Sequence, residues 1–255
     1  MSVIYNGILV NGTAHGKGTM TFSNGTYKGD FIDGKLTGKG KMTFISGNIY
    51  KGDFIDGKQT GKGTLIFSDG ETYEGDFIDG KQTGKGTLIF SDGDTYEGDF
   101  IDGKRHGKGK MTYTNGVIYK GDFIDGKRHG KGILTYSDDT YEGDFIDGKR
   151  HGKGILTYSD DTYEGDFIDG KRHGKGKMIF SDGTIQEGDF IDSVFSSLKN
   201  YGNEKNIIEE CPICYEDTKL IEYWKCKHSV CTTCTNNLIE KICPLCRDAL
   251  GNLII

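Results

Sequence analysis

The sequence has little proline and tryptophan, and its cysteines are confined to one region. Of 255 residues, two are proline, one is tryptophan and seven are cysteine, whereas 41 are glycine. This balance excludes a collagen-like chain or a proline-rich linker and indicates many turns. No apolar run approaches the 18 residues of a membrane-spanning helix, and the first residues lack the basic start and apolar core of a signal peptide. We therefore expect a protein that is neither secreted nor membrane-spanning.

The charge and the cysteine count narrow the expected partners and compartment. The formal net charge is -6, which disfavours an electrostatic grip on nucleic acid, so no nucleic-acid partner is expected. An odd number of cysteines, arranged as C-x2-C pairs without a secretory signal, favours metal binding in a reducing compartment over disulfides. We expect a cytoplasmic protein, with a nuclear or membrane-peripheral location left as the alternatives.

The first three quarters of the chain repeat one unit. The segment Gly-Asp-Phe-Ile-Asp occurs eight times, and units starting at the preceding aromatic residue recur every 22 or 23 residues. A truncated ninth copy begins at Gln186. Such a period indicates a stacked array of identical structural units. The full units begin at Tyr5, Tyr27, Tyr50, Tyr73, Tyr96, Tyr119, Tyr141 and Tyr163.

Within one unit, the alternation of side chains predicts a β-hairpin. In the unit at Tyr50, the residues Tyr50, Gly52 and Phe54 share one face of a strand, and Asp56-Gly57 supplies a turn. A second strand is expected over 63–67, followed by a turn at 68–70. Because a lone hairpin is marginal in water, the hairpins are expected to stack edge to edge and to bury their aromatic and glycine face.

The pattern Tyr-x-Gly-x-Phe-x-x-Gly-x-x-x-Gly-x-Gly resembles the MORN repeat over about residues 5–192. The resemblance implies an elongated single-layer antiparallel sheet that serves as a scaffold and, in some members, associates with lipid. We accordingly expect residues 1–192 to form a mainly β array of eight repeats and a partial ninth. The array is expected to hold a protein substrate, and a weak phospholipid contact is an additional expectation.

Two features of the repeats invite a functional interpretation. Four units carry histidine within Gly-Lys-Arg-His-Gly-Lys-Gly, but equivalent positions in adjacent hairpins lie about 10 Å apart, too far to share a zinc ion. We therefore interpret these histidines as structural. The preceding Lys-Arg pairs could form a basic stripe for anionic lipid, although a solvated edge that discourages aggregation is the favoured interpretation. The histidines are His106, His129, His151 and His173.

The C-terminal region concentrates metal-ligand chemistry. Four closely spaced pairs supply seven thiols and one imidazole within 36 residues, which is the donor set of two tetrahedral zinc ions. The spacing resembles the RING finger from about residue 209 onward, after a polar linker over 193–208. The resemblance implies a small α+β domain over 209–255 with two cross-braced zinc sites. It assigns one zinc to Cys211, Cys214, Cys231 and Cys234, and the other to Cys226, His228, Cys243 and Cys246.

The same resemblance implies a surface for a ubiquitin-conjugating enzyme. Ile213, Leu238 and Pro244 correspond to the apolar contacts of the family, and Arg247 to the basic residue that bridges ubiquitin and the conjugating enzyme. Leucine at 238, where tryptophan is also common, leaves partner choice open. Packing within the small domain is the alternative role of Ile213 and Leu238.

The sequence thus predicts a RING-type ubiquitin ligase that works without a covalent intermediate, because both zinc ions together use every cysteine. Its partners would be a charged conjugating enzyme, ubiquitin and a substrate on the repeats. A non-catalytic scaffold or a membrane-associated adaptor is the alternative. The apolar C-terminus, at 251–255, also suggests a RING homodimer, with docking on the chain's own RING as an equal account.

Overall fold

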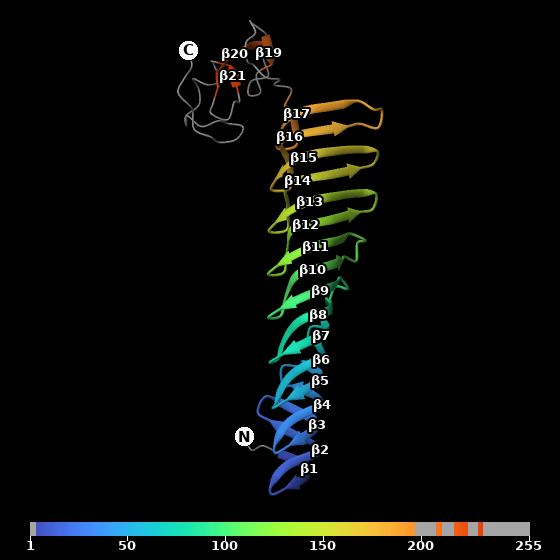
Figure 1. The fold of residues 1–255 in the computed structure, drawn as a ribbon, viewed down its shortest axis with the longest axis vertical. Helices are drawn as coiled ribbons and strands as arrows, with labels where there is room; N and C mark the ends of the chain where they lie inside the picture. Colours follow the sequence, from blue (N-terminus) through green and yellow to red (C-terminus); the bar gives the residue numbers. More distant parts are fainter. Residues whose placement is uncertain (1–3, 197–207, 211–216, 224–228, 232–255) are drawn as a thin grey trace.

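A computed structural model describes residues 4–196, 208–210, 217–223 and 229–231. In these ranges every regular element is a β-strand, and no helix there is long and apolar enough to cross a membrane. Strands β1 to β18 form one open antiparallel sheet in which each strand pairs with the next along the chain. The strands lie side by side up the long axis of the array (Figure 1).

The bounds of the strands repeat with the sequence units. In chain order the strands of the sheet are β1 (Ile4–Val10), β2 (Thr13–Phe22), β3 (Gly25–Ile32), β4 (Lys35–Phe44), β5 (Ile49–Ile55), β6 (Lys58–Ile66), β7 (Thr72–Ile78), β8 (Lys81–Ile89), β9 (Thr95–Ile101), β10 (Lys104–Thr112), β11 (Ile118–Ile124), β12 (Lys127–Tyr136), β13 (Asp139–Ile146), β14 (Lys149–Tyr158), β15 (Asp161–Ile168), β16 (Lys171–Ile179), β17 (Ile185–Ile191) and β18 (Val194–Ser196). Three further strands follow, β19 (Ile208–Glu210), β20 (Asp217–Tyr223) and β21 (Ser229–Cys231).

A two-residue turn closes each hairpin. Between β5 and β6, Asp56 and Gly57 both have positive φ, 49° and 82°. Positive φ at both central residues is the geometry of the type I′ turn, which matches the twist of the flanking strands. The Gly57 amide donates a hydrogen bond of 2.9 Å to the carbonyl of Leu36 in the preceding hairpin. The turn therefore also joins neighbouring units.

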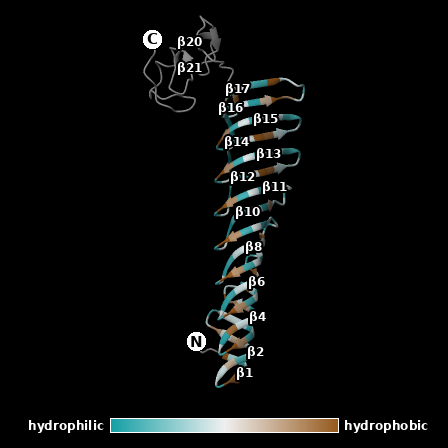
Figure 2. Cartoon of the chain, in the orientation of Figure 1, coloured by the Kyte–Doolittle hydropathy of each residue, from teal (hydrophilic) through white to brown (hydrophobic). Residues whose placement is uncertain are grey.

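The core is a single ladder of aromatic rings on one face of the sheet. Tyr50 is 0% exposed and contacts Phe54 of its own strand edge to face, with ring centroids 5.2 Å apart. It also contacts Phe77 of the next unit at 4.9 Å. This alternation continues through the array, and such pairs contribute beyond their buried area. Figure 2 shows hydrophobic and hydrophilic segments recurring at the same places in successive strands.

Glycine makes room for the tyrosine ring. Gly121 and Gly132 lie opposite each other on β11 and β12, under the ring of Tyr119. A Cβ atom on Gly132 would lie 2.5 Å from both the hydroxyl and Cε2 of that ring. Each tyrosine thus crosses its own hairpin, whereas the neighbouring hairpin contributes the phenylalanine.

A β-bulge explains the recurrent Gly-Lys-Gly and the aspartate of Gly-Asp-Phe. The pairing of β5 with β6 shifts between Gly52 and Asp53, so that Gly61 and Lys62 are extra residues. Gly61 has φ of 57°. Asp53 Oδ2 accepts a hydrogen bond of 3.3 Å from the Lys62 amide, and Asp53 Oδ1 lies 2.7 Å from Lys39 Nζ. The aspartate therefore satisfies an amide that the bulge removes from the strand pairing.

The expected fold is confirmed for the repeat array. The structure is an all-strand, single-layer antiparallel sheet of stacked hairpins, with the predicted turn at Asp56-Gly57. The second strand of the unit begins at Lys58, earlier than the expected 63–67, because the bulge lets it pair on both sides of the shift. The expected α+β zinc domain and the linker lie largely outside the described residues, so the domain boundaries stay predictions.

Candidate functional site

The predicted zinc and conjugating-enzyme residues lie outside the described residues, with one exception. Cys231 ends β21, whose backbone pairs with β20 so that Cys231 lies opposite Leu220. The zinc-ligand assignment and the contact residues therefore stay predictions. The residues outside the described ranges are Cys211, Ile213, Cys214, Cys226, His228, Cys234, Leu238, Cys243, Pro244, Cys246 and Arg247.

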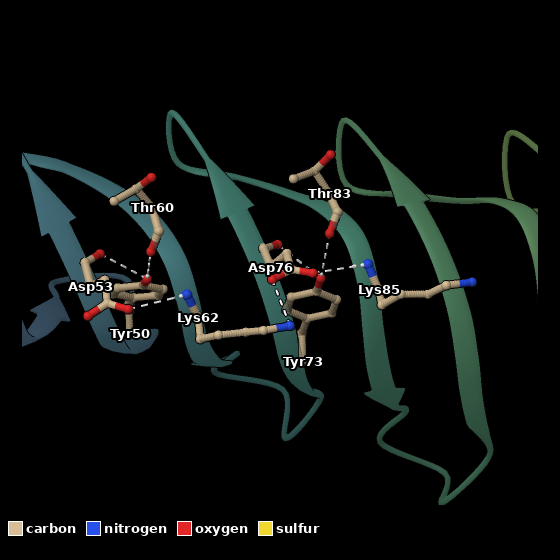
Figure 3. Close-up of polar contacts among 8 residues, drawn as sticks. All are labelled: Tyr50, Asp53, Thr60, Lys62, Tyr73, Asp76, Thr83 and Lys85. Carbon is tan, nitrogen blue, oxygen red and sulfur yellow. Dashed lines mark hydrogen bonds and ion pairs between the residues drawn. The ribbon is translucent and has the colours of Figure 1, made fainter.

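The repeated polar contacts of the array form a regular network (Figure 3). The hydroxyl of Tyr73 donates to the carbonyl of Asp76 at 3.1 Å and lies 3.4 Å from that of Thr83. The carboxylate of Asp76 lies 2.7 Å from Lys62 Nζ and accepts a hydrogen bond from the Lys85 amide at 3.2 Å. One unit is therefore linked to the previous unit by Lys62 and to its own second strand by Lys85.

Burial keeps the array tyrosines neutral. Removal from water raises the pKa of Tyr27, Tyr50, Tyr96 and Tyr163 to about 12, and the nearby aspartate of each unit contributes to the increase. The hydrogen bond to the aspartate carbonyl opposes this effect but is weaker. The neutral hydroxyl is the required form, because it must donate to a backbone carbonyl.

The aspartate of the bulge is held as a carboxylate. Partial burial raises the pKa of Asp99, but several favourable contacts outweigh it. The side chain of Lys85, the amide of Lys108 and the charges of Lys85 and His106 together hold this pKa below its usual value. The carboxylate is thus a structural charge rather than a general base, since a base would need a pKa nearer neutrality.

The Lys-Arg pairs do not form a uniform basic stripe. Lys149 lies 3.3 Å from the Asp169 carboxylate of the next turn, which offsets its charge. The guanidinium of Arg150 stacks over Tyr141 at 5.6 Å and Phe167 at 5.5 Å, and it donates to the Gly170 carbonyl at 2.8 Å. These arginines serve the aromatic core, a role that the sequence interpretation missed. The Arg-for-Gln variation between units was the signal for it.

The histidines have structural positions. His106 lies opposite Asp99 in the pairing of β9 with β10, and its carbonyl lies 3.4 Å from the hydroxyl of Tyr96. Within the described residues, no group of three or more histidine, cysteine, aspartate or glutamate side chains could hold a metal ion. His129 and His151 likewise lie opposite the aspartates Asp122 and Asp144, so these histidines have a place in the strand pairing.

Comparison with protein families identifies two modules. The MORN repeat model matches residues 5–26, 27–49, 50–72, 73–95, 96–118, 119–140, 141–162 and 163–185. The model for the zinc finger of C3HC4 type, the RING finger, matches residues 207–252.

Individual relatives are more distant. A RING finger protein of Acanthamoeba polyphaga mimivirus is 39% identical over 78 residues, which cover 26% of this chain and about 11% of that protein. The chain therefore spans only a small part of this relative. Among solved structures, the G-box domain of the microcephaly protein CPAP gives a TM-score of 0.42 at 12% identity, over 68% of this chain and 92% of that one. The TCP10 domain of Danio rerio CPAP gives 0.41 at 12% identity, over 68% and 83%. These scores say nothing about function.

The repeat match covers well over half of the chain, and its eight segments coincide with the tyrosine-led hairpins of the sheet. The chain belongs to the MORN repeat family and carries a C3HC4-type RING finger at its C-terminal end.

Proposed function

We propose that the protein is a RING-type ubiquitin ligase whose repeat array holds the substrate. The observation that carries this proposal is the RING finger match over residues 207–252, a segment that holds seven cysteines and His228. The RING finger would recruit a ubiquitin-charged conjugating enzyme, and the array would bring a protein substrate to it. Location in the cytoplasm belongs to this proposal, with nuclear and membrane-peripheral sites as its alternatives.

The donor set fits two structural zinc ions. Seven cysteine thiolates and one histidine imidazole are soft ligands that suit tetrahedral zinc, four to each ion. Cys211, Cys214, Cys231 and Cys234 would hold one ion, and Cys226, His228, Cys243 and Cys246 the other. Bound zinc would supply folding energy to a segment too small to bury a large core.

The chemistry would come from positioning rather than from a nucleophile of this chain. With all seven cysteines assigned to zinc, none is left to carry ubiquitin. Ile213, Leu238 and Pro244 would form the apolar contact with the conjugating enzyme. The rigid guanidinium of Arg247 would bridge that enzyme and ubiquitin, because its planar set of donors suits two acceptors at once. Holding the conjugate in a reactive arrangement accelerates transfer through proximity and orientation.

The array suits the role of a rigid holder. Its hairpins are linked through the aromatic ladder, the turn amides and the lysine–aspartate contacts, so a bound segment keeps a defined place. Stacked repeats commonly present such extended binding surfaces. Homodimerisation through the RING finger and weak contact with phospholipid are further parts of the proposal.

A self-ubiquitination assay tests the ligase activity. The full chain would be incubated with ubiquitin, activating enzyme and a panel of conjugating enzymes, and compared with Ile213→Ala and Arg247→Ala. We expect ubiquitin chains on the wild-type protein and a loss of at least about tenfold in each variant, the size expected from about 1.4 kcal/mol of lost contact.

Zinc content is the control for folding. Each variant should retain two zinc ions per chain, because neither substitution removes a ligand. A wild-type protein that binds both ions and yet transfers no ubiquitin with any conjugating enzyme would contradict the proposal. That outcome would favour a non-catalytic scaffold in which the RING finger mediates assembly only.

A further inference from the structure

A long groove runs across the strands on the face opposite the aromatic ladder. One cavity of about 1290 Å³ crosses β2 to β9, and a second of about 1500 Å³ crosses the strands from β10 onward. The paired glycines, such as Gly52 and Gly63, form the floor of the groove along its length. Because their Cβ positions point to the tyrosine face, these residues place no side chain in the groove. The array thus offers an open channel that the core does not use.

One row of side chains along this groove has one member on each strand. Each member directly follows the unit's tyrosine or the last glycine of Gly-Lys-Gly, and successive members lie opposite each other in the strand pairing. Lys28 lies opposite Lys41, and Lys41 lies opposite Lys51. The row continues through Thr64 and Glu74. We call this line of residues the groove row.

The groove row is where the repeats differ in charge. The position after the tyrosine is lysine in the units at Tyr27, Tyr50 and Tyr119. It is glutamate in the units at Tyr73, Tyr96, Tyr141 and Tyr163, and no other position of the unit reverses the sign of its charge. Solubility alone would not require the charge to change sign between repeats at the groove row and nowhere else in the unit. The variation therefore points to recognition along the groove.

The lysines at the N-terminal end of the groove row are exposed and close to one another. At about 4.8 Å per strand, Lys28 and Lys51 are about 10 Å apart, with Lys41 between them. Like charges directly opposite each other destabilise a sheet. Among the described residues these three lysines form no ion pair. The lysines of the Gly-Lys-Gly segments, such as Lys39 and Lys62, each contact an aspartate. Their charge is available to a ligand.

We propose that the groove binds an acidic, extended segment of a protein partner, with its carboxylates on Lys28, Lys41 and Lys51. Charge complementarity selects this occupant at the N-terminal end. The exposed Glu74 and Glu97 come next along the groove row, so basic residues of the partner would follow its acidic stretch. The groove row thereby sets the direction in which the segment lies.

The spacing of the three lysines suits an extended chain. An extended segment places a residue about every 3.3 Å, so four consecutive residues cover the 10 Å between Lys28 and Lys51.

This inference rests on the proposed function only in identifying the segment as part of a substrate. Binding to the groove can be measured without ubiquitin transfer. A chain with Ile213→Ala should bind the segment normally while it fails to transfer ubiquitin. Loss of peptide binding in the groove and loss of ubiquitin transfer are therefore separate, distinguishable results.

Fluorescence anisotropy with a labelled peptide tests the proposal on the full chain. The probe is an eight-residue peptide with four central glutamates flanked by glycine and serine. The variant carries Lys28→Gln, Lys41→Gln and Lys51→Gln together. We expect the wild-type chain to bind the probe and the variant to bind it on the order of tenfold more weakly, from three modest ion pairs. The affinity should fall as salt rises.

A second triple variant provides the matched control. Lys35→Gln, Lys58→Gln and Lys81→Gln remove the same charge from lysines on the turn side of the sheet, where each lysine contacts an aspartate. This variant should bind the probe like the wild type. A peptide with glutamine in place of glutamate should not bind. Equal losses in both triple variants, or equal binding of both peptides, would overturn the proposal.

The anionic ligand could instead come from a membrane, and vesicles distinguish the two. Vesicles of phosphatidylcholine with phosphatidylserine would be sedimented with the wild-type chain and with the groove variant. We expect the wild-type chain and the groove variant to sediment to the same extent, because the groove lysines are assigned to the peptide. If the wild-type chain sediments with the vesicles, the groove variant does not, and the wild-type chain fails to bind the glutamate peptide, the peptide proposal is overturned in favour of an anionic lipid.

Discussion

At the scale of the residue, the repeated tyrosine combines a hydrophobic and a polar requirement. Tyr50 is fully buried among rings, while its hydroxyl donates to the carbonyl of Asp53 at 3.2 Å. Only the protonated hydroxyl can donate, so the fold requires the neutral side chain. The array repeats this requirement in each unit, which makes its stability sensitive to alkaline pH.

We predict that the array loses stability as pH rises from about 10 to about 12. The folded-state pKa of Tyr50 is raised by burial to about 12, whereas a tyrosine in the unfolded chain titrates near 10. Above pH 10 the unfolded chain releases protons that the folded chain retains, so the free energy of unfolding falls with pH. Circular dichroism and phenolate absorbance, followed together, should show loss of the sheet and ionisation of the buried tyrosines at the same pH. Ionisation of the buried array tyrosines near pH 10, with the sheet still intact, would contradict the prediction.

The residue scale also shows how far the sequence could be interpreted. Alternation correctly placed Tyr50, Gly52 and Phe54 on one face, because a period of two is a local property of a strand. It could not reveal that Asp53 caps the amide of Lys62, since that contact depends on the shifted register of the next strand. For the RING finger, the assignment of ligands to the two zinc ions came from the resemblance to the family, and that assignment stays a prediction.

At the scale of the element, successive hairpins have the same aromatic core but differ in the side chain that lies over its rings. In the later units an arginine such as Arg150 lies over the rings and reaches the next turn. Glutamine occupies this position in the units at Tyr50 and Tyr73, as Gln59 and Gln82, and Leu36 occupies it in the unit at Tyr27. Glutamine has no charge to place over a ring, so the earlier hairpins lack the cation–π contact. The two halves of one sheet are therefore stabilised differently.

We predict that Gln82→Arg stabilises the array by about 0.5 to 1 kcal/mol, the contribution of a cation over an aromatic face at a partly exposed site. The new guanidinium would lie over Tyr73 and Phe100, as Arg150 lies over Tyr141 and Phe167. Urea denaturation followed by circular dichroism would measure the change. The matched control is Gln82→Lys, whose compact ammonium lacks the planar set of donors and should gain less. Equal stabilisation by lysine would show that charge alone is responsible.

At the scale of the whole molecule, the array and the zinc-binding region depend on different forces. Each inner strand of the array pairs with the strands before and after it, and among the described residues the ring ladder contains aromatic residues of the repeats and Phe195 of β18. The cysteine-rich region contains all seven cysteines of the chain, which are the predicted zinc ligands together with His228. Zinc binding is therefore expected to be coupled to the folding of that region alone.

Zinc removal tests this independence, because the sequence supplies separate optical reporters. Trp224 is the only tryptophan of the chain and lies among the predicted ligands, whereas the buried tyrosines belong to the array. We predict that a strong chelator changes the Trp224 fluorescence and abolishes binding of the conjugating enzyme, while the β-sheet circular dichroism and the thermal unfolding of the array are preserved. Readdition of zinc should restore the tryptophan signal. If chelation instead lowered the unfolding temperature of the array, the two parts would be energetically coupled, and the RING finger could sense whether the groove is occupied.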